Sequence, residues 1–189
     1  MSRKKETIIF IVIILVLGFW RFGGGQQLYF SPEKVMYACE KGLHYGPSEK
    51  VLLKKQMGNR AIVIGKLNDG ISVVHSKRSL LGMWKLGEGS VTGYWKTVDD
   101  VEAAYSSRFS LIYGAVKNKD IKTIEIAAAQ VKDGELEILE EANCNVDDDD
   151  GFFYANTGDY YSEDDGVYFR IAYIYGFDEN GTLIYSYSY

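Results

Sequence analysis

The stretch AIVIGKLNDGISVVH, residues 61–75, decides the fold of this chain of 189 residues. Asp69-Gly70 stands between two runs rich in β-branched residues, which is typical of a tight hairpin turn. A further run, Val51–Met57, precedes them and is separated from them by Gly58-Asn59. The sequence therefore predicts three successive antiparallel strands.

We expect one amphipathic helix just before these strands. Ser31 offers a capping hydroxyl, Pro32 suits the first helical position, and Gly42 supplies the stop. The buried stripe of this helix is expected to consist of apolar residues at helical spacing: Val35, Met36, Ala38, Cys39 and Leu43.

The rest of the chain alternates apolar runs with turn signals, except for Thr97–Tyr105, which we expect to be a second, short helix capped by Thr97. The further expected strands are a hairpin within 79–96, a pair made of 109–116 and 121–131, then 135–139 with Leu136 and Ile138 inward, 152–154, and a terminal hairpin of 167–177 with 182–189. About nine strands and two helices predict a mainly β (α+β) domain with one N-terminal amphipathic helix, folded as an antiparallel β sandwich or a curved sheet.

The N-terminal run Thr7–Trp20, TIIFIVIILVLGFW, carries no charge and follows Arg3, Lys4 and Lys5. A basic flank before an apolar run marks a segment for export whose basic end stays in the cytoplasm. As a helix the run would cover roughly 21 Å, which is shorter than the roughly 30 Å hydrocarbon core and favours a signal peptide. Its outer flank favours an anchor, because Gly18–Phe22 offers no small-x-small cleavage site.

We therefore predict an uncleaved signal-anchor, with a cleaved signal peptide as the alternative. Residues 1–6 are expected to be cytoplasmic, 7–22 to form a single transmembrane helix, 23–30 to be a spacer, and 31–189 to be an extracytoplasmic β-rich domain. The apolar side chains expected to hold the anchor in the cell membrane are Ile8, Phe10, Ile13, Leu15, Leu17 and Trp20.

Charge is distributed unevenly along the chain. Residues 1–90 hold 14 Lys and Arg against 6 Asp and Glu, whereas 91–189 hold 7 against 20, and the net charge is −5. Either the basic half faces anionic lipid or wall polymer, or the two halves complement each other within one fold. An acidic, exported chain argues against nucleic acid as a partner.

Cys39 and Cys144 are the only cysteines, and both fall on the outward side of the predicted anchor. A disulfide between them would close a long loop and constrain the unfolded chain. The alternative is a buried free thiol, because Cys39 lies on the apolar face of the predicted helix.

No motif with a specific chemical mechanism is present. The acidic run Asp147–Asp150 fails as an EF-hand, because Gly151 in the sixth position leaves Thr157 last, where a bidentate Glu is needed; an irregular carboxylate site is the alternative. His44 and His75 lie outside nucleophile-elbow, zinc or CxxC patterns. The sequence therefore predicts no catalytic residue, no metal ligand and no cofactor.

Tyrosines are concentrated near the end of the chain, where Tyr185, Tyr187 and Tyr189 recur at period two. That period places their rings on one face of a strand. Such rings either pack a core or stack on sugars and partner chains. These three tyrosines are the candidate aromatic binding face.

The segments CEKGLHYGPSEKVLLKK (39–55) and LLGMWKLGEGSVTG (80–93) resemble a pattern found in small membrane-anchored, extracytoplasmic proteins of Gram-positive, Bacillus-like bacteria, whose function is unassigned. The resemblance also covers the Pro-Glu helix start and the terminal Asp-x-Asn-Gly hairpin. It implies a place and an architecture, and it carries no functional residue over.

Position and composition together predict a non-enzymatic, single-pass membrane protein that presents a β-rich interaction domain outside the cell. Its expected partners, besides the membrane, are an envelope protein, a wall polymer or a peptide. The alternatives are a regulatory or accessory subunit of an envelope complex and an envelope hydrolase.

Overall fold

The computed structural model describes residues 8–14, 18, 27–87, 93–96, 99–158 and 168–189. This part of the chain is mainly β with antiparallel sheets, as predicted. The helix α2, Pro32–Gly42, precedes the strands, and a short 3-10 helix, η1, covers Ser107–Phe109. Ser31 caps α2 as expected, since its side chain accepts the N–H of Lys34.

The strands form three antiparallel sheets, named A, B and C here. Sheet A contains β1 (Lys50–Met57), β2 (Arg60–Leu67), β3 (Gly70–Arg78), β4 (Trp84–Leu86) and β5 (Gly93–Lys96). Sheet B contains β6 (Val101–Ser106), β7 (Leu111–Val116) and β10 (Phe152–Asn156), in the order β10-β7-β6. Sheet C contains β8 (Thr123–Lys132), β9 (Glu135–Asn145), β11 (Tyr168–Phe177) and β12 (Leu183–Ser188), in the order β12-β11-β8-β9.

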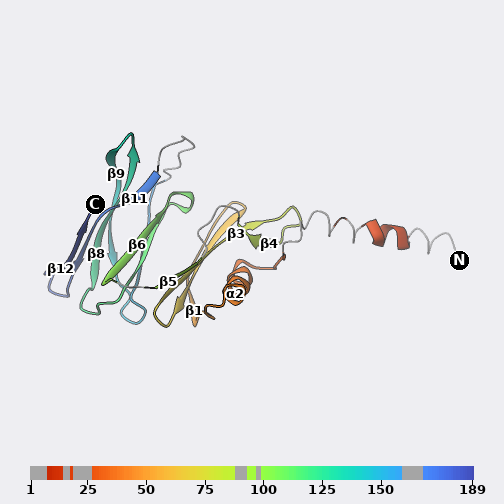
Figure 1. The fold of residues 1–189 in the computed structure, drawn as a ribbon, viewed down its shortest axis with the longest axis horizontal. Coiled ribbons are helices and arrows are strands. Elements are labelled where there is room, and N and C mark those ends of the chain that lie inside the picture. The colour runs from red at the N-terminus through yellow and green to blue at the C-terminus, as the bar shows by residue number, and fades with distance from the viewer. Residues whose placement is uncertain (1–7, 15–17, 19–26, 88–92, 97–98, 159–167) are drawn as a thin grey trace.

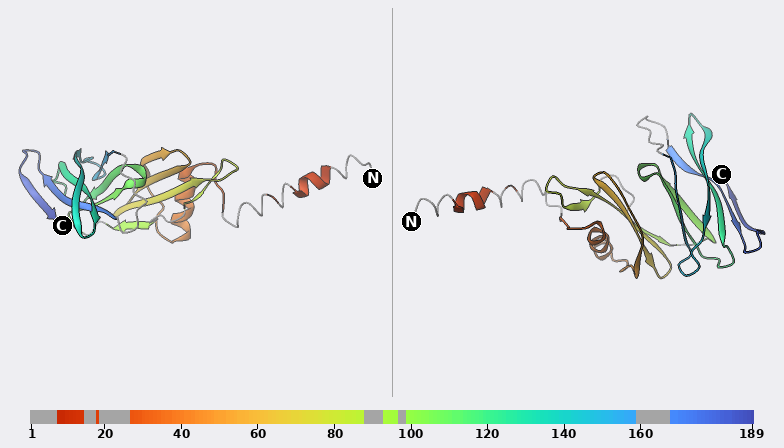
Figure 2. Two further views of the ribbon diagram at one scale, coloured as in Figure 1. Left: turned by 90° about the horizontal axis from the view of Figure 1, so that it is seen from above. Right: turned by 180° about the vertical axis from the view of Figure 1, so that it is seen from behind.

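Four layers stack in the order α2, sheet A, sheet B and sheet C (Figures 1 and 2). Each of the three interfaces has its own apolar cluster. Val35 and Met36 join α2 to sheet A, Phe109 and Leu111 join sheet B to the other face of sheet A, and Ile112 joins sheet B to sheet C. Sheet B is therefore covered by another sheet on both faces.

Strand β2 shows how one apolar run builds two of these interfaces. Ala61 and Val63 pack against α2, while Ile62 and Ile64 pack against sheet B, and all four side chains are fully buried. Successive residues of a strand point to opposite faces, so a strand that is covered on both faces is apolar throughout. The stretch 61–75 therefore belongs to a central strand pair, and the predicted order of three strands is confirmed.

Two predicted elements are wrong. Thr97–Tyr105 was expected to contain a helix, but Val101–Ser106 is the strand β6, which pairs with β7 along its whole length, and Thr97 lies outside the described residues. The expected hairpin within 79–96 is also absent from the described pairings, because β4 and β5 both pair with β3, at Ser76–Arg78 and at Gly70–Val73. In both cases a strand outside the predicted segment or hairpin supplies the backbone partners that short local signals did not predict.

Some burial and pairing predictions are wrong as well. Leu136 and Ile138 on β9 are exposed rather than inward, and Leu43 lies exposed beyond the end of α2. The strands predicted to pair as 109–116 and 121–131 lie in different sheets, because β7 pairs with β6 and β10, whereas β8 pairs with β9 and β11. The terminal hairpin is confirmed, with β11 paired to β12.

The predicted signal-anchor lies only partly within the described residues. Residues 8–14 are helical, and the side chains of Ile8, Phe10 and Ile13 are exposed. Leu15, Leu17 and Trp20 lie outside the described residues. No helix in the described part of the chain is both long enough and apolar enough to cross a membrane. The anchor therefore stays a prediction.

A buried carboxylate fixes the connection between α2 and β1. Glu40 is 1% exposed, and it accepts hydrogen bonds from the Ser48 hydroxyl at 2.5 Å and from the Ser48 N–H at 3.0 Å. Gly65 on β2 leaves the space for this serine, because a Cβ there would lie 2.3 Å from the Ser48 hydroxyl oxygen. Glu40 therefore lies on the buried side of α2, although the apolar periodicity of the helix did not predict a charged residue there.

We expect Ser48→Ala to lower the free energy of unfolding by about 1–3 kcal/mol, because it removes a hydrogen-bond donor from a buried carboxylate. Urea unfolding of the variant and the wild type measures the difference. Ser188→Ala, which removes an exposed hydroxyl, is the matched control and should change stability by less than about 0.5 kcal/mol. Equal losses in the two variants would contradict a structural role for the Glu40–Ser48 pair.

Candidate functional site

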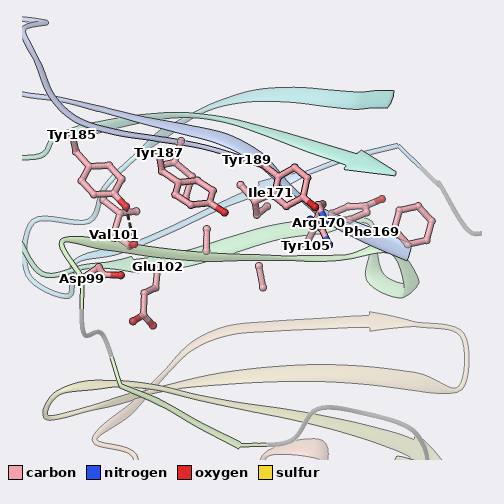
Figure 3. Close-up of a pocket in the computed structure, with 13 residues that line it drawn as sticks. Asp99, Val101, Glu102, Tyr105, Phe169, Arg170, Ile171, Tyr185, Tyr187 and Tyr189 are labelled. Atoms are coloured by element: carbon pink, nitrogen blue, oxygen red, sulfur yellow. Dashed lines mark hydrogen bonds between the residues drawn. The ribbon is translucent and has the colours of Figure 1, made fainter. Parts of the chain in front are cut away.

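An open cleft of about 660 Å³ lies between sheets B and C (Figure 3). One side is formed by Asp99 and by β6, and the other side by β11 and β12. The side chains that line it are mostly aromatic or charged: Asp99, Glu102, Tyr105, Phe169, Arg170, Tyr185, Tyr187 and Tyr189.

The cleft exists because the two sheets differ in width. Sheet C has four strands and sheet B has three, so β7 packs over β8 while β12 at the edge extends beyond sheet B. Tyr187 and Tyr185 of β12 are paired with Ile174 and Gly176 of β11, and Ile174 points into the interface between sheets B and C. The face of β12 that carries the tyrosines is therefore directed toward sheet B but is only partly covered by it.

The structure places Tyr185, Tyr187 and Tyr189 in one row along the cleft, as their period predicts (Figure 3). Tyr185 is half-buried and donates a long hydrogen bond of 3.5 Å to the Val101 carbonyl. Tyr187 and Tyr189 are 44% and 68% exposed. The ring of Tyr185 is therefore part of the core, whereas the rings of Tyr187 and Tyr189 present large surfaces to solvent.

Arg170 supplies the positive charge of the cleft. Its guanidinium lies 3.9 Å from the ring centre of Tyr189 and 4.9 Å from that of Tyr168, which are favourable cation–π distances. Its Nε atom is buried and has no hydrogen-bond partner among the described residues. Among the described residues, ring faces rather than a carboxylate position the arginine, so its charge can face an anionic group.

Negative charge gathers at the other end of the tyrosine row. Asp99 and Glu102 are lining residues near Tyr185, but the Glu102 side chain projects from β6 away from the tyrosine rings (Figure 3). Burial, followed by the charges of Asp99 and Asp100, raises the pKa of Tyr185. The cleft therefore has an acidic end beside Tyr185 and a basic end beside Tyr189.

Sequence reasoning missed Arg170 and the acidic residues of the cleft. Arg170 is the only Lys or Arg after Lys132, so its place in a tyrosine-rich strand was a signal that could have been used. Asp99 and Glu102 had no such signal, because their segment was predicted to be helical.

The acidic run Asp147–Asp150 forms ion pairs and a turn. Asp150 binds Lys50 at 2.6 Å and Lys66 at 2.8 Å, and Asp147 accepts the N–H groups of Asp149 and Asp150. Burial alone would raise the pKa of Asp150, but hydrogen bonds from the two lysines lower it. These pairs join the basic and the acidic half of the chain, and the described residues contain no cluster suited to a metal ion.

Cys39 and Cys144 are both free thiols in the structure. Cys39 packs at the interface of α2 with sheet A, and Cys144 is buried between sheets B and C. Of the two alternatives, the structure has the free thiols and not the disulfide. Burial raises the pKa of Cys144 to about 11, so this thiol stays protonated at neutral pH.

The two histidines lie apart from the cleft. His44 is exposed with a positive φ of 59°, and His75 lies on β3 with its ring centre 5.2 Å from that of Phe109. Burial, with a smaller effect of Arg108, lowers the pKa of His75 to about 4. His75 is therefore a neutral residue of the interface between sheets A and B.

No protein-family model matches this chain, and neither a curated protein nor a solved structure matches it. The geometry alone therefore defines the class of protein, which is an antiparallel β domain of three stacked sheets with an open aromatic cleft.

We expect His75 to make stability depend on pH. Its folded pKa of about 4 lies below the usual 6.5, so the unfolded chain takes up a proton first as the pH falls. The stability that neutral His75 contributes is present above about pH 6.5 and is lost toward pH 4, by up to about 3 kcal/mol. Urea unfolding at several pH values should show this loss for the wild type relative to His75→Phe.

The exposed His44 provides the control, because His44→Asn tolerates the positive φ and should keep the pH dependence of the wild type. If the curves of the wild type and His75→Phe run parallel between pH 7 and pH 4, the buried neutral state of His75 is refuted.

Proposed function

We propose that this chain is a non-enzymatic, single-pass membrane protein whose β-rich domain binds a wall polymer outside the cell. The observation that carries the proposal is the cleft in which Tyr187 and Tyr189 present exposed rings beside the cation of Arg170. An open cleft with ring faces, a cation and a carboxylate is suited to an extended polar ligand.

The chemistry of the cleft supports a glycan. Tyrosine faces pack against the C–H face of a sugar ring and keep their hydroxyls in water. The carboxylate of Asp99 can accept hydrogen bonds from sugar hydroxyls, and Arg170 can pair with a carboxylate or phosphate of an anionic wall polymer. None of the described residues that line the cleft is a histidine, cysteine or serine, so the described lining contains no Ser–His or Cys–His pair.

The position of the cleft is consistent with presentation away from a membrane. The chain enters the domain at Tyr29, whose N–H and C=O both bond to Trp84 of β4 in sheet A at 2.7 Å. The cleft lies between sheets B and C, on the far side of sheet A from α2 (Figure 1). A segment anchored ahead of Tyr29 would leave the cleft directed outward.

We expect the full chain in detergent to co-sediment with purified peptidoglycan carrying its anionic polymers. The double substitution Tyr187→Ala with Tyr189→Ala should weaken this binding at least about tenfold, because it removes both exposed ring faces. Arg170→Gln should reduce the salt dependence of binding.

Tyr37→Ala on α2 is the matched control, since Tyr37 is exposed to a similar degree, 42%, and lies far from the cleft in the layer order. Binding by the wild type that neither cleft substitution weakens would place the site elsewhere. A wild-type chain that stays in the supernatant would refute the wall polymer as the ligand.

The proposed anchor has its own test. We expect the full chain to stay with membranes after a high-salt wash and to be degraded by protease added to cells whose wall has been removed. Deletion of residues 1–22 should move the domain to the soluble fraction, because it removes the apolar run. A truncated domain that still sediments with membranes after the wash would show that another part of the chain holds it there.

A further inference from the structure

Strand β12 is an edge of sheet C, and within the described residues no strand pairs with its outer side. The Tyr189 N–H donates to the Ala172 carbonyl at 2.8 Å, which fixes the hydrogen-bonding phase of the β11–β12 pair. Hydrogen bonds alternate along an antiparallel pair, so the N–H and C=O groups of Ser186 and Ser188 face away from β11. They form a regular row of donors and acceptors to which another extended strand can bond.

The two edges of sheet C differ in how they are protected. On β9, the opposite edge, four glutamates stand in the strand: Glu135, Glu137, Glu140 and Glu141. On β12, the sequence LIYSYS carries no charge and no proline, and Leu183, Ile184 and Tyr187 are 51%, 39% and 44% exposed. Soluble proteins usually guard exposed edges with charge, proline or a bulge. The register of β12 shifts only at its start, where Ile184 has no partner on β11, so the part from Tyr185 onward is an unguarded edge that another strand can pair with.

We propose that β12 is a dimerisation edge, at which the β12 of a second copy of this chain adds as an antiparallel strand. The inference concerns the outer side of β12 and does not depend on what the cleft binds. A twofold axis at Ser186 would place each Ser186 opposite its counterpart, with the two residues exchanging N–H···O bonds. Tyr185 of one copy would then lie opposite Tyr187 of the other, an aromatic cross-strand pair.

Charge supports an antiparallel second copy over other occupants. The basic end of the cleft, at Arg170, lies beside Tyr189, and the acidic end, at Asp99, lies toward Tyr185 (Figure 3). Antiparallel pairing of two β12 strands brings the basic end of one cleft next to the acidic end of the other. The edge is thus complementary to itself, and the two tyrosine rows would join into one longer surface.

The glutamates of β9 explain why the assembly would stop at two copies. Pairing of β12 with β9 of another copy is a head-to-tail contact that would continue into a fibre. Such pairing would place charged side chains against an uncharged, apolar strand, whereas β12 pairs with itself without that cost.

Sedimentation velocity of the full chain in detergent, over a wide range of concentrations, tests the proposal. We expect a monomer–dimer equilibrium whose dissociation constant rises at least about tenfold in Ser186→Pro, because proline removes the outward N–H on the axis from both copies. The ladder with β11 does not use this N–H, so the fold should persist. Ser186→Ala keeps the N–H and should dimerise like the wild type.

A second variant tests the same edge in case Ser186→Pro fails to fold. Ser186→Lys places like charges opposite each other on the axis and should also weaken the dimer, while the circular dichroism spectrum and the midpoint of thermal unfolding stay close to those of the wild type. In isolated membranes, Ser186→Cys should give a crosslinked dimer with a short bis-maleimide, and Lys41→Cys on α2 should not.

Three outcomes would overturn the proposal. The first is a wild-type chain that is monomeric throughout and whose Ser186→Cys variant gives no crosslinked dimer. The second is a dimer that neither Ser186→Pro nor Ser186→Lys weakens, which would mean that another surface or the N-terminal helix mediates it. The third is open-ended association, which would indicate head-to-tail pairing of edges.

Discussion

The structure depends on the burial of sheet B on both of its faces. This sheet has three strands, and its central strand β7, LIYGAV, must contact sheet A with one set of side chains and sheet C with the other. Gly114 shows how tightly this strand packs against its neighbour in the sheet, because a Cβ there would lie 2.4 Å from the ring of Phe153, its cross-strand partner on β10. A narrow, doubly covered sheet fixes the spacing of the layers, and the wider sheet C then extends past it, which leaves the tyrosine face of β12 open.

Local sequence signals were sufficient where the partner of a strand is its neighbour along the chain. Asp69-Gly70 and Asn180-Gly181 lie at turns between adjacent β-branched or aromatic runs, and both hairpins form with the expected strands. The cap at Ser31 also predicted its helix correctly. These elements depend on backbone geometry within a few residues, which a single sequence expresses directly.

Local signals failed where the partner lies far along the chain. The segment that forms β6 was predicted to be helical, because Thr97 followed by Asp99 and Asp100 is typical of the start of a helix. In the structure, the edge of β7 offers this segment a full set of backbone partners. Glu40 was missed because its partner, Ser48, follows the helix and because a buried carboxylate breaks the apolar period. The cleft could not be predicted for the same reason. Its residues Asp99, Arg170 and Tyr187 come from three segments that only the stacking of sheets B and C brings together.

The row of tyrosines is better explained by the difference in sheet width than by core packing alone. If β12 served only the core, its ring-bearing face would be covered as β8 is, whose Ile124, Ile126 and Ala128 are fully buried under sheet B. Instead burial falls along the row from Tyr185 to Tyr189, while the cation of Arg170 lies against the most exposed ring. Leaving large ring surfaces in water forgoes the free energy that their burial would contribute, although the domain buries its other apolar strands well. A ligand that covers the rings would explain why they are left exposed.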